Sequence, residues 1–306
     1  MPANSADQEP DRRAWKTATI DAPAHWNYPL PADCLDWALD AKDVNANTVV
    51  PISCSQALAP VRQALEKGRG FALVEGLPIE ELSAPQAQAA YWALGHYLGR
   101  PTRQNIEGAL LYDVRDTGQE VSQGARFSVT NAESTFHTDN AFNPQLPDIV
   151  GLLCLQTARR GGRSQLLSAR TLYNELARYP DVLDTLSAPW HFDRRGQFDP
   201  GHPPVSQYPI FQHLGDDLTM RYMHYYIEVG HQRLGQPFSP AQRRALDVLE
   251  EQIRRPDLRV EFDLGPGQML FTNNRWILHN RTAFDDYDQP DRRRHYIRLW
   301  LQRHQD

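Results

Sequence analysis

An imidazole and a carboxylate stand two residues apart in the run Phe136–Asp139, as His137 and Asp139. Alternate side chains of an extended segment share a face, so both groups can point at one centre. A second imidazole, His279, follows the apolar run Trp276–Leu278 and would lie at the mouth of a strand. Two histidines and one carboxylate form the facial triad that binds non-haem iron(II) and leaves positions open. The same ligands can hold a hydrolytic zinc ion, so the triad alone leaves the metal undecided.

The His-x-Asp spacing by itself is weak support for a metal site. With 11 histidines and 25 aspartates, about one such pair is expected from the composition, whereas three occur. The pair His191 and Asp193 is followed by two arginines that can neutralise the carboxylate, and the third pair lies in the last three residues. The first pair differs from these because His279 at a strand end can complete its ligand set.

The closing run Arg294–Leu301 alternates polar and apolar side chains with the period of a β-strand. Arg294 and Arg298 therefore share one face with Tyr296 and Trp300. An unpaired buried charge is very costly, and no acidic residue neighbours these arginines within the strand, so they need an anionic partner. A cosubstrate that carries a carboxylate would satisfy a guanidinium through two parallel hydrogen bonds. A zinc hydrolase gives no reason for such an arginine.

Short apolar or alternating runs separated by turn residues predict the strands that must position these groups. The strands are too closely spaced for helical crossovers, so we expect a mostly β fold closed into a sandwich or barrel, with helices packed outside and an α/β N-terminal part. The predicted strands are 71–74, 149–155, 165–167, 260–264, 268–271, 276–278 and 296–301, and the predicted helices are 55–67, 83–98, 168–178 and 239–254.

Two segments stand apart from this frame. Residues 1–13 have few apolar side chains to offset the entropy of ordering them, which predicts a disordered tail before a single domain over 14–306. The segment 188–237 is rich in proline, histidine and tyrosine and is too long for a plain turn. It is typical of a lid or binding insertion.

Taken together, these motifs resemble the taurine dioxygenase-like family of iron(II)- and 2-oxoglutarate-dependent oxygenases, in the clavaminate synthase-like superfamily. The resemblance spans about residues 70–301, and the order and spacing of the motifs are more specific than any one of them. It rests on Phe136–Asp139, Gly161–Ser164, Gly265–Gln268 through Asn274, Leu278–Phe284 and Arg294–Leu301.

The resemblance implies a double-stranded β-helix, or jelly roll, with iron(II) held by His137, Asp139 and His279. It also implies that 2-oxoglutarate chelates the iron while its far carboxylate meets Arg294. The hydroxyl of Ser164 would assist, at a position where typical members carry threonine. Iron, Asp139, 2-oxoglutarate and Arg294 then have no net charge, so the cluster can lie away from water.

The implied reaction consumes dioxygen and 2-oxoglutarate, releases succinate and carbon dioxide, and oxidises an unactivated C–H bond of a small molecule. Hydroxylation is the default outcome, while desaturation, cyclisation and bond cleavage stay open. Asp139 argues against halogenation, because halogenases of this family lack the carboxylate ligand. Two other classes also stay open at this point: a non-catalytic jelly-roll protein that binds a small molecule, and a zinc-dependent hydrolase.

Four further residues are candidates for contacts with the substrate. In the family the second arginine of the closing run, here Arg298, often meets an anionic group, which indicates an anionic or zwitterionic substrate. Asn105, Arg221 and Tyr222 could also reach the substrate, although Asn105 fits a turn and the other two fit a half-buried strand. Glu133 fits either an acceptor for a ligand imidazole or an exposed acid.

The composition argues against several other classes of protein. The 32 basic and 38 acidic residues give a net charge of −6, so no positive field favours nucleic acid. No run approaches the roughly 20 apolar residues of a membrane span, and the polar N-terminus is unlike a secretory signal. Cys34, Cys54 and Cys154 are odd in number and widely spaced, which predicts no disulfide and favours a reducing cytoplasm. A homo-oligomer stays open.

Overall fold

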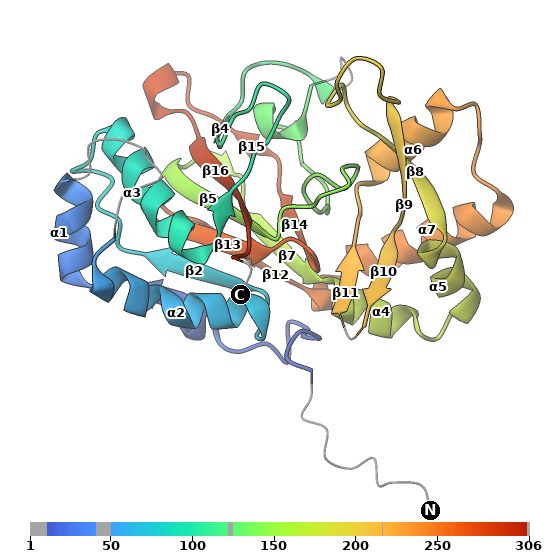
Figure 1. The fold of residues 1–306 in the computed structure, drawn as a ribbon, viewed down its shortest axis with the longest axis horizontal. Helices are drawn as coiled ribbons and strands as arrows, with labels where there is room; N and C mark the ends of the chain where they lie inside the picture. The colour runs from blue at the N-terminus through green and yellow to red at the C-terminus, as the bar shows by residue number, and fades with distance from the viewer. Residues whose placement is uncertain (1–10, 41–49, 122–124, 216, 305–306) are drawn as a thin grey trace, which may run out of the picture.

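A mixed seven-stranded sheet lies at the centre of the computed structural model, which describes residues 11–40, 50–121, 125–215 and 217–304 (Figure 1). Its order is β1-β2-β13-β5-β16-β3, and β4 also pairs with β16. The pairing of β1 with β2 is parallel, and the other pairings are antiparallel. The strands are β1 (Asn27–Pro29), β2 (Phe71–Glu75), β3 (Arg100–Pro101), β4 (Leu111–Val114), β5 (Ile149–Gln156), β13 (Met269–Asn273) and β16 (His295–Gln302).

A smaller antiparallel sheet carries the second histidine of the predicted triad. Its order is β12 (Arg259–Phe262), β7 (Ser164–Ser168) and β14 (Ile277–Arg281), and His279 of β14 pairs with Leu166 of β7. A two-stranded pair, β6 (Arg160–Gly161) with β15 (Phe284–Asp285), closes the loop beyond β14.

The large sheet separates two hydrophobic cores, because alternate residues of each strand point to opposite faces. Phe71, Leu270 and Tyr296 belong to the core that the large sheet shares with the small one. Ala72, Phe271 and Ile297, each one residue further on, belong to the other core. That second core also contains buried side chains of the helices α1 (Ala32–Asp40), α2 (Ile52–Glu66) and α3 (Ala84–Leu98), which lie at the left in Figure 1.

The strands and helices predicted from the sequence are confirmed, with shifts of a few residues at their ends. Ser239 begins α7 (Pro240–Arg254) as predicted: its hydroxyl accepts a hydrogen bond from the Gln242 N–H at 3.2 Å, and the Gln242 side chain accepts one from the Ser239 N–H at 3.0 Å. Helices make up more of the described chain than the expected mostly β fold implied. The other helices are α4 (Ala169–Leu176), α5 (Pro180–Ser187) and α6 (His224–Arg233), with short 3-10 turns at 23–25, 127–129, 256–258 and 290–292.

The segment 188–237 is built from regular elements. The hairpin of β8 (Pro189–Asp193) and β9 (Val205–Pro209) precedes a second hairpin of β10 (Phe211–Leu214) and β11 (Asp217–Met220), and α6 follows. Figure 1 shows this unit at the right, beside α5 and α7. Asp193 is fully buried and is paired with Arg195 and Arg233, so the second His-x-Asp pair serves the frame of this unit.

The last residues of the predicted tail have defined contacts in the structure. Residues 1–10 of the predicted tail lie outside the described residues, whereas Asp11 and Arg13 have defined contacts. The carbonyl of Arg13 accepts a hydrogen bond from Ser168 at the start of α4. Residues 11–13 therefore belong to the folded part, which corrects the predicted tail boundary.

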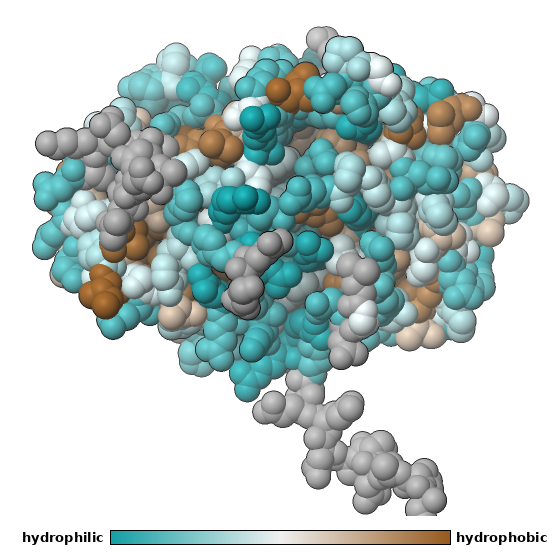
Figure 2. All heavy atoms as spheres, viewed as in Figure 1, coloured by the Kyte–Doolittle hydropathy of each residue, from teal (hydrophilic) through white to brown (hydrophobic). Residues whose placement is uncertain are grey.

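The surface of the described chain is mainly polar. Figure 2 shows hydrophilic residues over most of the visible face, with apolar ones scattered among them. Among the described residues, the exposed large apolar side chains are Ile52 on α2, Ile106 and Leu110 in the loop between β3 and β4, and Leu234 after α6. Among the described helices, none is long and apolar enough to cross a membrane.

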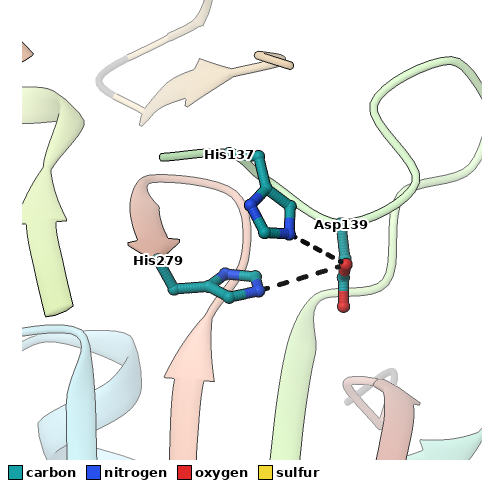
Figure 3. Close-up of side chains that lie close together, drawn as sticks. All are labelled: His137, Asp139 and His279. Atoms are coloured by element: carbon teal, nitrogen blue, oxygen red, sulfur yellow. Dashed lines mark ion pairs between the residues drawn. The ribbon is translucent and has the colours of Figure 1, made fainter. Parts of the chain in front are cut away.

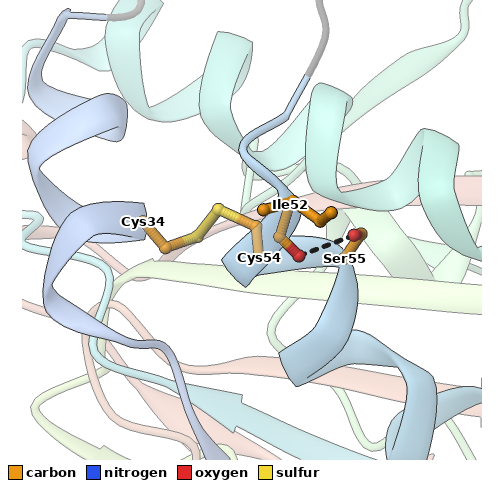
Figure 4. The surroundings of a disulfide bond; sticks show 4 residues. All are labelled: Cys34, Ile52, Cys54 and Ser55. Carbon is orange, nitrogen blue, oxygen red and sulfur yellow. Dashed lines mark hydrogen bonds between the residues drawn. A yellow bond between two sulfur atoms is a disulfide. The ribbon is translucent and has the colours of Figure 1, made fainter.

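Cys34 of α1 and Cys54 of α2 form a disulfide, which makes the prediction of unpaired cysteines wrong (Figure 4). Both residues are fully buried, and their Cα atoms are 5.4 Å apart. The two helices pack against the same face of the sheet, and this packing brings together cysteines that are 20 residues apart in sequence. Cys154 is a free, buried core residue, as expected. The argument for a reducing compartment, which rested on unpaired cysteines, no longer holds.

When the protein is unfolded in guanidinium chloride without reductant, we expect one thiol, that of Cys154, to react with a thiol reagent. After reduction, three thiols should react. Replacing both Cys34 and Cys54 by alanine should lower the free energy of unfolding by about 3 kcal/mol, because the bond restricts the unfolded chain. Urea unfolding followed by circular dichroism measures this change, and added reductant should not affect the double variant. Three reactive thiols before reduction would contradict the pairing.

Candidate active site

His137, Asp139 and His279 converge on one point, as the spacing predicted (Figure 3). Asp139 Oδ1 lies 3.6 Å from His137 Nε2 and 4.0 Å from His279 Nε2. One ligand atom from each of the three residues lies within 4.8 Å of the others, and no other such cluster of three occurs in the described chain. Two imidazole nitrogens and one carboxylate oxygen this close together are the ligand set of a facial triad.

Backbone hydrogen bonds place the two histidines side by side. His137 N–H donates to the carbonyl of His279 at 3.0 Å, and His279 N–H donates to the carbonyl of His137 at 2.9 Å. This isolated antiparallel bridge adds the segment around His137 to the edge of β14. The ring centroids are 4.3 Å apart as a result. The edge of the small sheet therefore sets the separation of the two imidazoles.

Asn274 fixes the position of Asp139 through its backbone. The Asn274 side chain accepts a hydrogen bond from Asp139 N–H at 2.7 Å and donates to the Asp139 carbonyl at 3.0 Å and to the Pro147 carbonyl at 3.1 Å. Asn274 is fully buried, and it directly follows β13. Thr135 and Asn140, on either side of the ligand segment, adopt left-handed conformations with φ of 57° and 60°, so the segment turns sharply at both ends.

The two imidazoles differ in what their outer nitrogens meet. His137 Nδ1 lies 2.8 Å from the carbonyl of Thr135, so this nitrogen donates and Nε2 carries the free lone pair. His279 Nδ1 is buried and has no hydrogen-bond partner among the described residues. Glu133, the other acceptor considered from the sequence, instead accepts a hydrogen bond from Asn280 at 2.7 Å.

Electrostatics keep Asp139 and His279 in the protonation states that a metal requires. Burial alone would raise the pKa of Asp139, but the charge of Arg298 and the two neighbouring imidazoles hold it well below its usual range. Burial, together with the neighbouring His137, lowers the pKa of His279 to about 3. An ionised carboxylate and a neutral imidazole are the forms that bind a divalent cation.

Two side chains of β16 donate hydrogen bonds to the carboxylate of Asp139. Trp300 Nε1 donates to Oδ2 at 2.8 Å, and Arg298 Nη1 donates to Oδ1 at 3.3 Å. Both belong to the polar face that the alternation of the closing run predicted. The contact of Trp300 with Asp139 was not predicted. The strand period, which places Trp300 on the same face as Arg298, could have indicated it.

Arg294 is a buried cation with which no described carboxylate forms an ion pair. Its side chain is nearly inaccessible, it stacks over Tyr296 at 3.7 Å, and its Nε and Nη1 atoms have no hydrogen-bond partner among the described residues. Burial lowers its pKa from the ordinary arginine value. The backbone of Gly162 approaches so closely that a Cβ there would lie 3.4 Å from Arg294 Nε. These unpaired donors line the same cavity as the triad and fit a carboxylate.

Ser164 lies in the middle strand of the small sheet, buried, and pairs with Arg281 of β14. It does not belong to the described lining of the cavity that holds the triad and Arg294. The structure therefore brings the triad, Arg294 and Arg298 together in one cavity, while Ser164 lies outside its described lining. The other lining residues include Val114, Arg126, Ser128, Phe142, Leu152, Met223, Tyr226 and Arg281.

The three other residues predicted to contact the substrate have different partners. Asn105 accepts a hydrogen bond from the N–H of Ala109 at 2.8 Å and so closes a turn, while its neighbour Gln104 points inward and is buried. Arg221 donates to the carbonyls of Ala141, Asn143 and Pro144, and it braces the loop after Asp139. None of the three belongs to the described lining of the cavity.

Tyr222 connects the ligand segment to α7. Its N–H donates to Thr138 Oγ1 at 3.0 Å, and its hydroxyl contacts Glu250 and lies 3.2 Å from His224 Nδ1. The ring is fully buried. Tyr226, four residues further along, belongs to α6, which begins at His224. Its side chain lines the cavity.

A family model described as Taurine catabolism dioxygenase TauD, TfdA family matches residues 27–300. The chain belongs to this family. FR-33289 synthase of Streptomyces rubellomurinus is 31% identical over 307 aligned residues, which cover 95% of this chain and 89% of that relative. A uridine-5'-phosphate dioxygenase of a Streptomyces species is 32% identical over 243 residues, covering 73% of this chain and 82% of the relative.

The fold of this TauD/TfdA-family protein is shared with asparagine oxygenase, solved in complex with Fe(II), 2S,3S-3-hydroxyasparagine and succinate. The TM-score is 0.71 at 20% identity, and the match covers 90% of this chain and 93% of the other. The protein is an iron(II)- and 2-oxoglutarate-dependent dioxygenase that acts on a small molecule. The enzyme class and cofactors predicted from the sequence are confirmed, and the alternatives of a zinc hydrolase and a non-catalytic binding protein are set aside.

Replacing Asn274 by alanine should weaken iron(II) binding by about 10- to 100-fold, because the backbone of Asp139 loses the amide that positions it. Anaerobic competition with a chromophoric chelator measures the affinity. Asn105→Ala, which removes an amide outside the cavity, serves as the matched control and should bind iron(II) like the wild type. Equal affinities for all three proteins would show that Asn274 does not position the ligand.

Tyr222→Phe should leave iron(II) and 2-oxoglutarate binding unchanged and lower the free energy of unfolding by about 1 kcal/mol, since only the hydroxyl contacts to Glu250 and His224 are lost. Urea unfolding and anaerobic titration of both cofactors measure the two effects. A stable variant with impaired cofactor binding would return Tyr222 to the active site.

Proposed function

We propose that the enzyme hydroxylates an unactivated C–H bond of a small anionic molecule, with iron(II) held by His137, Asp139 and His279. The observation that carries the proposal is Arg294, a buried guanidinium with two unpaired nitrogens in the cavity of the triad. It offers the carboxylate receptor that a bound 2-oxoglutarate needs, and Ser164 is proposed to assist with its hydroxyl.

The charges of these groups support this assignment. Iron(II) and Arg294 contribute three positive charges, and Asp139 and 2-oxoglutarate contribute three negative ones. The assembled cluster is neutral, so it can be buried without an unpaired charge. Without the cosubstrate, the charge of Arg294 has no partner within the described cavity.

When bound, iron and 2-oxoglutarate supply the oxidising chemistry, with release of succinate and carbon dioxide. The residues of this chain position the reactants. Trp300 and Arg298 hold the Asp139 carboxylate ionised and fixed. Val114, Phe142 and Leu152 line the cavity with apolar surface that limits the access of water.

The finer features of the fold are part of the same proposal. The large sheet packed on β12-β7-β14, with the triad at the edge of β14, supports a double-stranded β-helix core. A single oxygenase domain over 14–306, with 188–237 as an insertion that brings Tyr226 to the cavity, agrees with a core that both sheets share. The cytoplasmic location and a homo-oligomeric state stay predictions.

Anaerobic addition of iron(II) and then 2-oxoglutarate should produce the weak visible charge-transfer band of a chelated keto acid. His279→Ala should abolish the band. Arg294→Gln should keep it but require about 10- to 100-fold more 2-oxoglutarate, the cost of charge-assisted hydrogen bonds. Arg100→Gln, which removes an exposed arginine on β3, should titrate like the wild type. A wild-type protein that gives no band would refute the proposed cofactor site.

A further inference from the structure

Two arginines of the cavity, Arg126 and Arg298, are attached to the same residue. Arg298 Nε donates to Gln104 Oε1 at 2.8 Å, and Arg126 Nη1 donates to the Gln104 carbonyl at 3.3 Å. Gln104 in turn donates to the Arg298 carbonyl at 2.9 Å and is 2% exposed. A neutral amide thus holds two cations near each other, although like charges repel in a poorly solvated site.

The positive charge of the cavity lining exceeds its negative charge. Its described lining contains Arg126, Arg281, Arg294 and Arg298 but only one carboxylate, Asp139. Arg281 is held by the carbonyls of Thr130 and Ala132. Under the proposed function, Arg294 meets 2-oxoglutarate and Asp139 meets iron(II). Arg126 and Arg298 then lack a full counter-charge, and no described carboxylate forms an ion pair with Arg126.

A third donor lies next to Arg126 on the same wall. Ser128, in the 3-10 turn Phe127–Val129, lines the cavity, and its Oγ is buried without a hydrogen-bond partner among the described residues. A hydroxyl and two guanidinium groups offer donors suited to the three terminal oxygens of a phosphoryl or phosphonyl group.

We propose that Arg126, Ser128 and Arg298 form the site for a dianionic head group, a phosphate monoester or phosphonate, on the substrate of this dioxygenase. The proposal rests on the proposed function and names its substrate class. It disfavours free α-amino acids, because their ammonium group would find no carboxylate in the described lining except the metal ligand Asp139.

The test uses anaerobic enzyme loaded with iron(II) and 2-oxoglutarate, and it measures binding by calorimetry at about pH 8. Propyl phosphate and propyl sulfate have the same shape but carry two charges and one charge. We expect propyl phosphate to bind at least about tenfold more tightly to the wild type. Butylphosphonate, measured in parallel, distinguishes a phosphonate from an ester, and L-asparagine should bind far more weakly than either.

Arg126→Gln should weaken propyl phosphate binding by about 10- to 100-fold and remove the preference over propyl sulfate. Arg126→Lys should recover part of the loss, and Ser128→Ala should show a smaller one. Arg103→Gln, an exposed arginine beside Gln104, is the matched control and should behave like the wild type. The charge-transfer band and 2-oxoglutarate affinity of the Arg126 variants should equal those of the wild type, which shows that they are folded.

Equal binding of the phosphate and the sulfate, unchanged phosphate binding by Arg126→Gln, or tight binding of L-asparagine would each overturn the inference. These outcomes are separate from failure of the proposed function. A wild-type protein without the charge-transfer band but with the phosphate preference would refute the cofactor site and keep the anion site. A protein that shows the charge-transfer band but binds propyl phosphate and propyl sulfate equally would keep the cofactor site and refute the anion site.

Discussion

The charge of Asp139 is the interaction on which the active site depends. It is the one carboxylate in the described lining of a cavity that also contains four arginines. Two β16 side chains hold its oxygens, Asn274 holds its backbone, and two imidazoles face it. Any movement of this carboxylate would unbalance a buried set of charges, so the surrounding fold must keep it in place.

One face of strand β16 packs in a hydrophobic core, and the other face contacts Asp139. Its apolar residues Ile297, Leu299 and Leu301 pack into the core that the N-terminal helices cover. Its opposite face presents Arg298 and Trp300 to the cavity. Because alternate residues of one strand serve both purposes, the hydrophobic packing that fixes the strand also fixes the donors around Asp139.

The residues that complete the cavity come from loops and helices far apart in the chain. Arg126 and Ser128 come from the segment before the triad, and Tyr226 comes from α6. Gln104, in the loop after β3, lies behind this lining and joins Arg126 to Arg298. Sequence reasoning chose Asn105 and Tyr222 from the same stretches. Neither residue belongs to the described lining, because the direction of a loop side chain depends on turn geometry that neighbouring packing decides. By contrast, the period of a strand predicted the faces of β16 correctly.

The sequence by itself determined the triad, the two arginines of the closing strand and the main strands and helices. Those features depend on local periodicity and on motif spacing, which a single segment contains. The tertiary structure alone decided the bridge between His137 and His279, the disulfide of Cys34 with Cys54, and the joining of Arg126 to Arg298 through Gln104. Each of these contacts connects segments that are far apart in the sequence. No local sequence pattern could therefore predict it.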